Sequence, residues 1–123
     1  MPIDLPEILN WRRIDDLLTT SGQPSAEQFE QIKAIGITAI INLAPADSKD
    51  ALPAESKIIG ELGMQYAYVP VDFEAPTDAD FEQFCAAMDR FSGDQIHIHC
   101  IYNARVTAFM TRYIRDGSGG DLA

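Results

Sequence analysis

Cys100 and Arg105 stand five positions apart, where the sequence pattern changes from that of a strand to that of a helix. The alternation over residues 95–99 predicts a β-strand. From Val106 onward, apolar residues recur every three or four positions, which predicts a helix. The cysteine therefore lies at a helix N-terminus, a setting that favours an anion and lowers the pKa of a thiol. Arg105 adds a fixed charge with a fork of donors that suits phosphate, so this stretch is suited to nucleophilic attack on phosphorus.

The elements that must position these residues alternate between strand and helix along the chain. The expected strands are residues 14–20, 37–43, 66–71 and 95–99. The expected helices are residues 25–36, 53–62, 77–91 and 106–114. This alternation predicts an α/β fold with three layers, a mainly parallel sheet flanked by helices. Right-handed crossovers would bring the carboxyl ends of the strands to one edge, where the loops 44–52, 72–76 and 100–105 are expected to converge.

Two of the expected helices begin with capping boxes. Ser25 is followed by Gln28, and Thr77 is followed by Asp80, the spacing at which the two side chains cap each other's backbone. The apolar stripe of the helix over 77–91 includes Cys85, which is expected to be a core residue because free cysteine is among the most buried residue types.

Composition limits the class of protein. The 123 residues predict one domain, residues 1–123, with an irregular arm over 1–10 and a flexible tail over 116–123. The net charge of −10 argues against nucleic acid and against long-range attraction of phosphorylated substrates. No apolar run is long enough for a membrane helix and no signal pattern opens the chain, so a cytoplasmic protein is expected. Neither a metal nor another cofactor is indicated, because no His, Cys and carboxylate cluster has ligand spacing.

The segments Ser21-Gly22-Gln23-Pro24, Ile41-Asn42-Leu43, Pro70-Val71-Asp72-Phe73 and His99 to Phe109 share a pattern with a known group of proteins. Across residues 14–115 the chain resembles the cysteine-dependent protein tyrosine phosphatase superfamily, of dual-specificity type. The fuller pattern resembles a bacterial branch of that superfamily, called tyrosine-phosphatase-like or β-lactamase-hydrolase-like. Because relatives with this fold continue with further helix, the chain is short at its C-terminus. Exposed apolar surface is expected there, which a second copy of the chain could cover.

The loop after Cys100 departs from the pattern of that superfamily. Four residues separate Cys100 from Arg105 instead of five, and none of them is glycine. Val106 follows the arginine where a hydroxyl residue is usual; counted from Cys100, Thr107 occupies the hydroxyl position. A gap of four residues is also the loop length of rhodanese-like sulfurtransferases.

The resemblance implies a role for each residue of the site. Cys100 is the expected nucleophile, Arg105 binds phosphate oxygens, and Asp72 is the expected general acid with Glu74 as second candidate. Substrate phosphate would be bound by the loop and its neighbours, at Ile101, Tyr102, Asn103, Ala104, Arg105, Thr107 and Glu74.

Three further side chains near the loop have simpler expected roles. Thr107 either donates to the thiolate or bonds back to its own helical turn. His99 is expected to orient the loop through hydrogen bonds. His97 is expected to be structural and to lie on the same face of the sheet as His99.

Three functions follow from this sequence. The leading hypothesis is a phosphatase that hydrolyses a phosphotyrosine, a phosphoserine or phosphothreonine, or a small phosphorylated compound through a cysteinyl-phosphate. The second is a non-catalytic module that binds phosphate or a similar anion. The third is a sulfurtransferase that carries a persulfide on Cys100.

Overall fold

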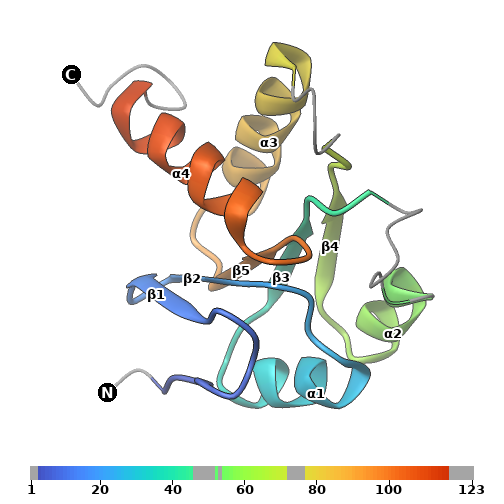
Figure 1. The fold of residues 1–123 in the computed structure, drawn as a ribbon. Coiled ribbons are helices and arrows are strands. Elements are labelled where there is room, and N and C mark those ends of the chain that lie inside the picture. Colours follow the sequence, from blue (N-terminus) through green and yellow to red (C-terminus); the bar gives the residue numbers. More distant parts are fainter. Residues whose placement is uncertain (1–2, 46–51, 53, 72–76, 117–123) are drawn as a thin grey trace.

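A computed structural model describes residues 3–45, 52, 54–71 and 77–116, and in these ranges the chain forms one five-stranded sheet (Figure 1). The strands are β1 Arg12–Asp15, β2 Leu18–Ser21, β3 Ala39–Asn42, β4 Gln65–Tyr68 and β5 Ile96–His99. The helices are α1 Ala26–Ala34, α2 Glu55–Glu61, α3 Asp78–Arg90 and α4 Ala104–Asp116. The order across the sheet is β1-β2-β5-β3-β4, and only β1 runs antiparallel to its neighbour. The predicted three-layer α/β fold with a mainly parallel sheet is confirmed.

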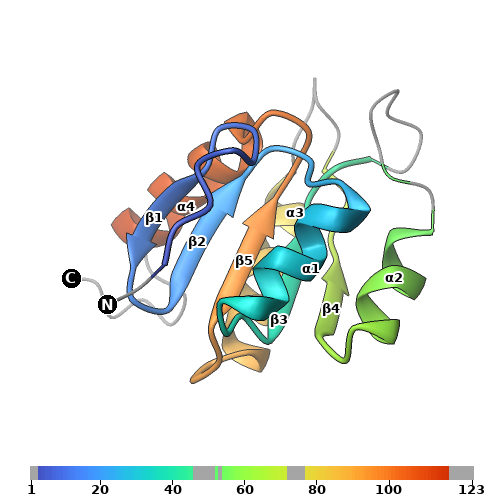
Figure 2. The same cartoon turned by 90° about the horizontal axis from the view of Figure 1, so that it is seen from below.

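The sheet separates two apolar cores (Figures 1 and 2). Helices α3 and α4 cover one face, where Phe84 and Phe109 pack against Ile41 and Ile98. Helices α1 and α2 cover the other face, with Phe29 among the buried residues. Successive side chains of a strand point to opposite faces, so each central strand supplies both cores.

The prediction of one strand over residues 14–20 was wrong. The chain turns back at Asp16 and Leu17, and β1 and β2 form an antiparallel hairpin in which Arg13 lies opposite Thr19. The side chain of Asp15 accepts a hydrogen bond from the backbone N–H of Leu17 at 2.8 Å, so a side chain makes this turn in place of glycine or proline.

The helices agree closely with the prediction. Both capping boxes are formed, at Ser25 with Gln28 and at Thr77 with Asp80. Helix α4 begins at Ala104, two residues earlier than expected, and extends to Asp116, which was expected to open the tail. Cys85 is half-buried against the α3–α4 core, and burial raises the pKa of its thiol.

The two ends of the chain differ in how much of them the structure describes. Residues 3–10, within the expected arm, contain neither helix nor strand, and Ile8 among them is fully buried. Residues 117–123 of the expected tail lie outside the described residues. Ile114 near the end of α4 is exposed, and its coverage by a second copy of the chain stays a prediction. In the described ranges no helix has the length and apolar character that a membrane crossing needs.

Strand register brings three strand ends level. Ser21 of β2 and Asn42 of β3 both pair with His99 of β5. The backbone N–H of Leu43 then donates to the His99 carbonyl at 2.8 Å, and the N–H of Cys100 to the Ser21 carbonyl at 3.4 Å. The cysteine loop therefore starts at the centre of the sheet's carboxyl edge, where α/β sheets bind ligands.

Candidate active site

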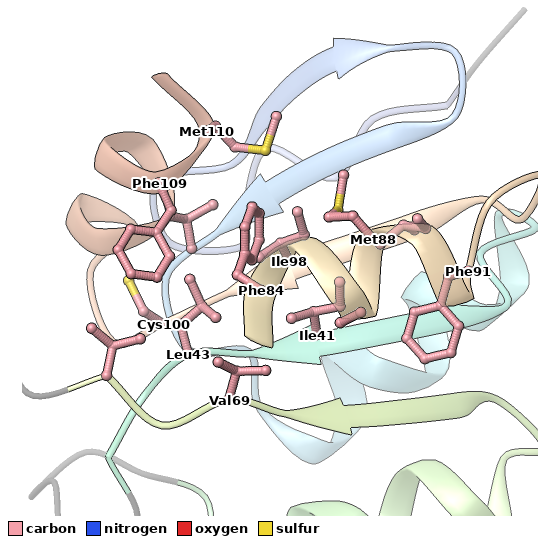
Figure 3. Close-up of a cluster of buried hydrophobic side chains, with 14 of the residues drawn as sticks. Ile41, Leu43, Val69, Phe84, Met88, Phe91, Ile98, Cys100, Phe109 and Met110 are labelled. Atoms are coloured by element: carbon pink, nitrogen blue, oxygen red, sulfur yellow. The ribbon is translucent and has the colours of Figure 1, made fainter. Parts of the chain in front are cut away.

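Cys100 is the first residue after the central strand β5 and lies four residues before α4 begins. Its side chain is only 1% exposed and points toward Phe109 within the α3–α4 core (Figure 3). Cys100 is therefore both buried at the end of a strand and close to the start of a helix. The thiol faces the apolar core in this conformation of the loop.

The segment after β2 packs directly against the cysteine loop. The backbone N–H of Gln23 donates to the carbonyl of Ile101 at 2.9 Å. A Cβ atom at Gly22 would lie 2.6 Å from that same carbonyl oxygen, closer than real Cβ contacts allow. Only glycine at position 22 therefore permits this close approach. The sequence analysis singled out the segment 21–24 but did not predict this contact.

Asn103 provides the turn that leads from the loop into α4. Its φ is +72°, the left-handed region that glycine favours and that asparagine adopts more readily than most residues. Its amide Nδ2 donates to the carbonyl of Asn10 at 2.8 Å and to Thr20 Oγ1 at 3.0 Å. Asparagine thus supplies a left-handed residue in a loop that has no glycine.

Tyr102 and Thr107 lie on the outer side of the loop. Tyr102 is 55% exposed, and its carbonyl accepts a hydrogen bond from Asn10 Nδ2 at 2.9 Å. Thr107 Oγ1 donates to the carbonyl of Asn103 at 2.7 Å, which is the helical back-bond of the two alternatives considered for this hydroxyl. Both residues line a pocket of about 590 Å³ between the N-terminal arm and the start of α4.

Three of the expected site groups fall outside what the structure describes. Asp72 and Glu74 lie outside the described residues, as do residues 46–51 of another expected loop. The backbone of Arg105 is in the first turn of α4, but its side chain is outside the described part. The convergence of three loops on Cys100 therefore stays a prediction.

His97 lies on the α1–α2 side of the sheet, fully buried, and makes two hydrogen bonds. Its Nδ1 is 2.7 Å from Thr19 Oγ1 and its Nε2 is 2.8 Å from Ser21 Oγ. Ser21 Oγ donates its own proton to the carbonyl of Gly22, so it accepts one from Nε2 of the ring.

Burial holds the pKa of His97 well below 6.5, with His99 as a smaller cause. With Trp11 stacked on the ring at 5.0 Å, these contacts support the predicted structural role.

His99 points to the same face as His97 and is also fully buried. Its Nε2 lies 2.7 Å from Glu55 Oε2, and its Nδ1 lies 3.2 Å from the carbonyl oxygen of Cys100. The ring therefore contacts the backbone of the loop, as expected of a residue that orients it.

Glu55 was missed by sequence reasoning. It is the first residue of α2 and only 5% exposed, although it is a carboxylate. Its Oε1 accepts from Gln23 Nε2 at 2.8 Å, and its Oε2 accepts from the hydroxyl of Tyr66 at 3.1 Å. Burial and the nearby Glu55 raise the pKa of Tyr66, which keeps the phenol protonated as a donor. No local pattern around Glu55 marked it, because its partners lie far away in the sequence.

No metal site adds to this picture: within the described ranges, no three His, Cys, Asp or Glu side chains are grouped so that they could hold a metal ion.

The sheet order and the strand–cysteine–helix connection give the chain, at the level of fold, the architecture of protein tyrosine phosphatase-like structures. At the level of fold, P. aeruginosa TpbA in complex with pTyr superposes with a TM-score of 0.68 and 16% identity, over 89% of this chain and 65% of that one.

Closer relatives narrow the family. Two crystal structures of a "Putative phosphatase (DUF442)" from Shewanella putrefaciens CN-32 share 38% identity, with TM-scores of 0.86 and 0.87. They cover 94% and 96% of this chain, and 74% and 79% of the Shewanella chain. The protein belongs to this DUF442 family.

Curated relatives carry the name that the sequence resemblance indicated. The "Beta-lactamase hydrolase-like protein" of Agrobacterium fabrum is 33% identical over 91 residues, and that of Xylella fastidiosa Temecula1 is 32% identical over 90 residues. These matches take in 72% and 71% of this chain but only 21% of either relative, so the chain spans about a fifth of their length. No family model matches the sequence.

Proposed function

We propose that this chain is a phosphatase domain that hydrolyses phosphomonoesters through a phosphorylated cysteine at position 100. The observation that carries the proposal is the place of Cys100, between the central strand of the sheet and the left-handed turn at Asn103 that opens α4. Helix starts of this kind present backbone N–H groups to an anion. The DUF442 relative from Shewanella, which carries the name "Putative phosphatase", supports the same function.

The proposed reaction has two steps. The thiolate of Cys100 attacks phosphorus, and the ester oxygen leaves with a proton from Asp72, or from Glu74 if that residue is the acid. Arg105 binds two phosphate oxygens and their developing charge. Water then attacks the cysteinyl-phosphate, which releases inorganic phosphate and returns the thiolate.

The substrate class is a phosphotyrosine, a phosphoserine or phosphothreonine, or a small phosphorylated compound. The TpbA structure holds pTyr, which makes an aryl phosphate the natural first probe. Because the curated relatives are about five times as long as the matched segment, the proposal concerns this domain and not their whole activity.

A binding module without turnover is the second candidate, and one observation favours it. The Cys100 side chain is buried against Phe109 and not open to solvent. In such a protein the loop would bind phosphate, but the thiol would not reach phosphorus.

Hydrolysis of para-nitrophenyl phosphate separates these two functions. We expect turnover by the wild-type chain, at least a thousandfold loss in Cys100→Ser, and little change in Cys85→Ser as the matched cysteine control. We expect Asp72→Asn to lose the limb of the pH profile that needs a protonated acid, and Glu74→Gln to keep it. Phosphate binding by a folded wild-type chain that releases no nitrophenol would contradict the phosphatase and favour the binding module.

A further inference from the structure

The His99 ring faces a hydrogen-bond acceptor on each side. Nε2 faces the carboxylate of Glu55 at 2.7 Å, and Nδ1 faces the backbone carbonyl of Cys100 at 3.2 Å. A neutral imidazole has one N–H donor, whereas the charged ring has two. The ring can donate both of these hydrogen bonds only when each of its two nitrogens carries a proton.

The carboxylate of Glu55 receives donors from several strands. Besides His99, it accepts from Gln23 Nε2, which follows β2, and from the Tyr66 hydroxyl of β4. The Tyr66 oxygen in turn accepts from Asn42 Nδ2 of β3 at 2.9 Å. A carboxyl group used only as an acceptor is ionised, so it matches a doubly protonated ring.

We propose that Glu55 is a positioning residue for the cysteine loop: its carboxylate keeps the His99 ring charged, and that ring holds the carbonyl of Cys100. The effect on turnover rests on the proposed phosphatase function, whereas the charged pair itself does not. Ring and thiol lie on opposite faces of the sheet, so the pair acts on Cys100 through its backbone. Glu55 of α2 thereby sets the geometry of the cysteine loop through His99, which lies 44 residues further along the chain.

The surroundings of the pair are consistent with a charge on His99. The Phe29 ring of α1 packs on one side of the His99 ring at a steep angle, with ring centroids 5.7 Å apart. The titratable groups around the ring are Glu55 of α2, Tyr66 of β4 behind it, and His97 two residues back on β5. Burial lowers the pKa of His97 and holds its ring neutral, with His99 as a smaller cause, so His97 does not place a second charge beside the pair.

Ring nitrogen NMR tests the pair without any assay of turnover. The chain has two histidines, so two ring patterns are expected, and His97→Gln assigns them. From about pH 6 to about pH 8, where an unperturbed histidine loses its charge, we expect two protonated nitrogens in His99 and one, Nε2, in His97. A neutral wild-type His99 ring would overturn the proposal, and this measurement needs no variant of Glu55.

Two variants of α2 then test the link to the loop. In Glu55→Gln we expect a neutral His99 ring and a fall in kcat for para-nitrophenyl phosphate of about tenfold, with KM nearly unchanged, because a displaced nucleophile slows the chemical step. Glu61→Gln, an exposed carboxylate on the same helix, should change neither the ring nor kcat. Unchanged kcat with a neutral ring in Glu55→Gln would overturn the positioning role. If the wild-type chain shows no turnover, the proposed function fails. The ring spectra still show whether His99 and Glu55 form a charged pair.

Discussion

Asn103 meets two demands of the cysteine loop at once. Its backbone is left-handed at φ +72°, and its amide ties the loop to the arm at Asn10 and to β2 at Thr20. Glycine could satisfy the first demand but not the second. The loop therefore turns into α4 without a glycine and gains side-chain contacts in exchange.

Substitution at this position should separate backbone from side chain. Asn103→Gly and Asn103→Ala both lose the amide hydrogen bonds, but only alanine carries a Cβ into the left-handed region, at a cost of about 1 kcal/mol. We expect urea denaturation to give Asn103→Ala a free energy of unfolding lower than that of Asn103→Gly by about that amount. Equal stabilities of the two variants would contradict the left-handed geometry.

His97 should make the protein sensitive to acid. Its pKa in the folded chain lies well below 6.5, so below that pH the unfolded chain binds a proton that the folded chain does not. The stability that the neutral ring contributes is present above pH 6.5 and is lost as the pH falls, by up to about 1.4 kcal/mol per pH unit.

His97→Gln is the variant that tests this sensitivity, because its amide can replace the Nε2 donor without titrating. We expect its free energy of unfolding to fall less steeply than that of the wild type between about pH 6.5 and about pH 5. The measurement is urea denaturation at a series of pH values, and parallel curves for the two proteins would count against a buried neutral His97.

At the scale of elements, the helices were predictable and the first strands were not. The capping boxes at Ser25 and Thr77 fix helix starts by contacts between residues three apart, which a sequence displays directly. The hairpin of β1 and β2 has strands of four residues and a turn made by the side chain of Asp15, with no glycine, asparagine or proline to mark it. Without such a residue at the turn, the sequence over both strands resembles that of one continuous strand.

Some residues of the candidate site could likewise be predicted from the sequence and others could not. Cys100, Asn103 and the start of α4 are contiguous, so the loop could be recognised from the sequence. Glu55 could not be, because its partners His99 and Gln23 come from segments that meet only in the folded sheet (Figure 2). A local sequence pattern can reveal site residues that lie in the same loop or helix. Site residues that are brought together by tertiary contacts become visible only in the structure.

At the scale of the whole molecule, charge opposes the proposed substrate. The net charge of −10 repels a phosphorylated compound at long range, while the cysteine loop attracts it only at contact. Salt screens the first interaction more than the second, because the screening length falls to about 8 Å at physiological ionic strength.

The proposed phosphatase should therefore work faster in moderate salt. We expect kcat/KM for para-nitrophenyl phosphate to rise about twofold when ionic strength is raised from about 0.01 M to about 0.15 M. Steady-state rates in sodium chloride at constant pH measure this change. A steep fall with salt would show instead that local ion pairs dominate substrate capture.

The order of the strands also has a consequence in time. Strand β5 lies between β2 and β3, which pair with it and not with each other, yet it comes last of the five along the chain. During synthesis, β1 with β2 and β3 with β4 can form only two separate ribbons, each with an unsatisfied inner edge. Residues 96–99 join them, so the strand that delivers Cys100 to its place is also the one that closes the sheet. Until a ribosome has released that strand, both inner edges stay open to pairing with other nascent chains.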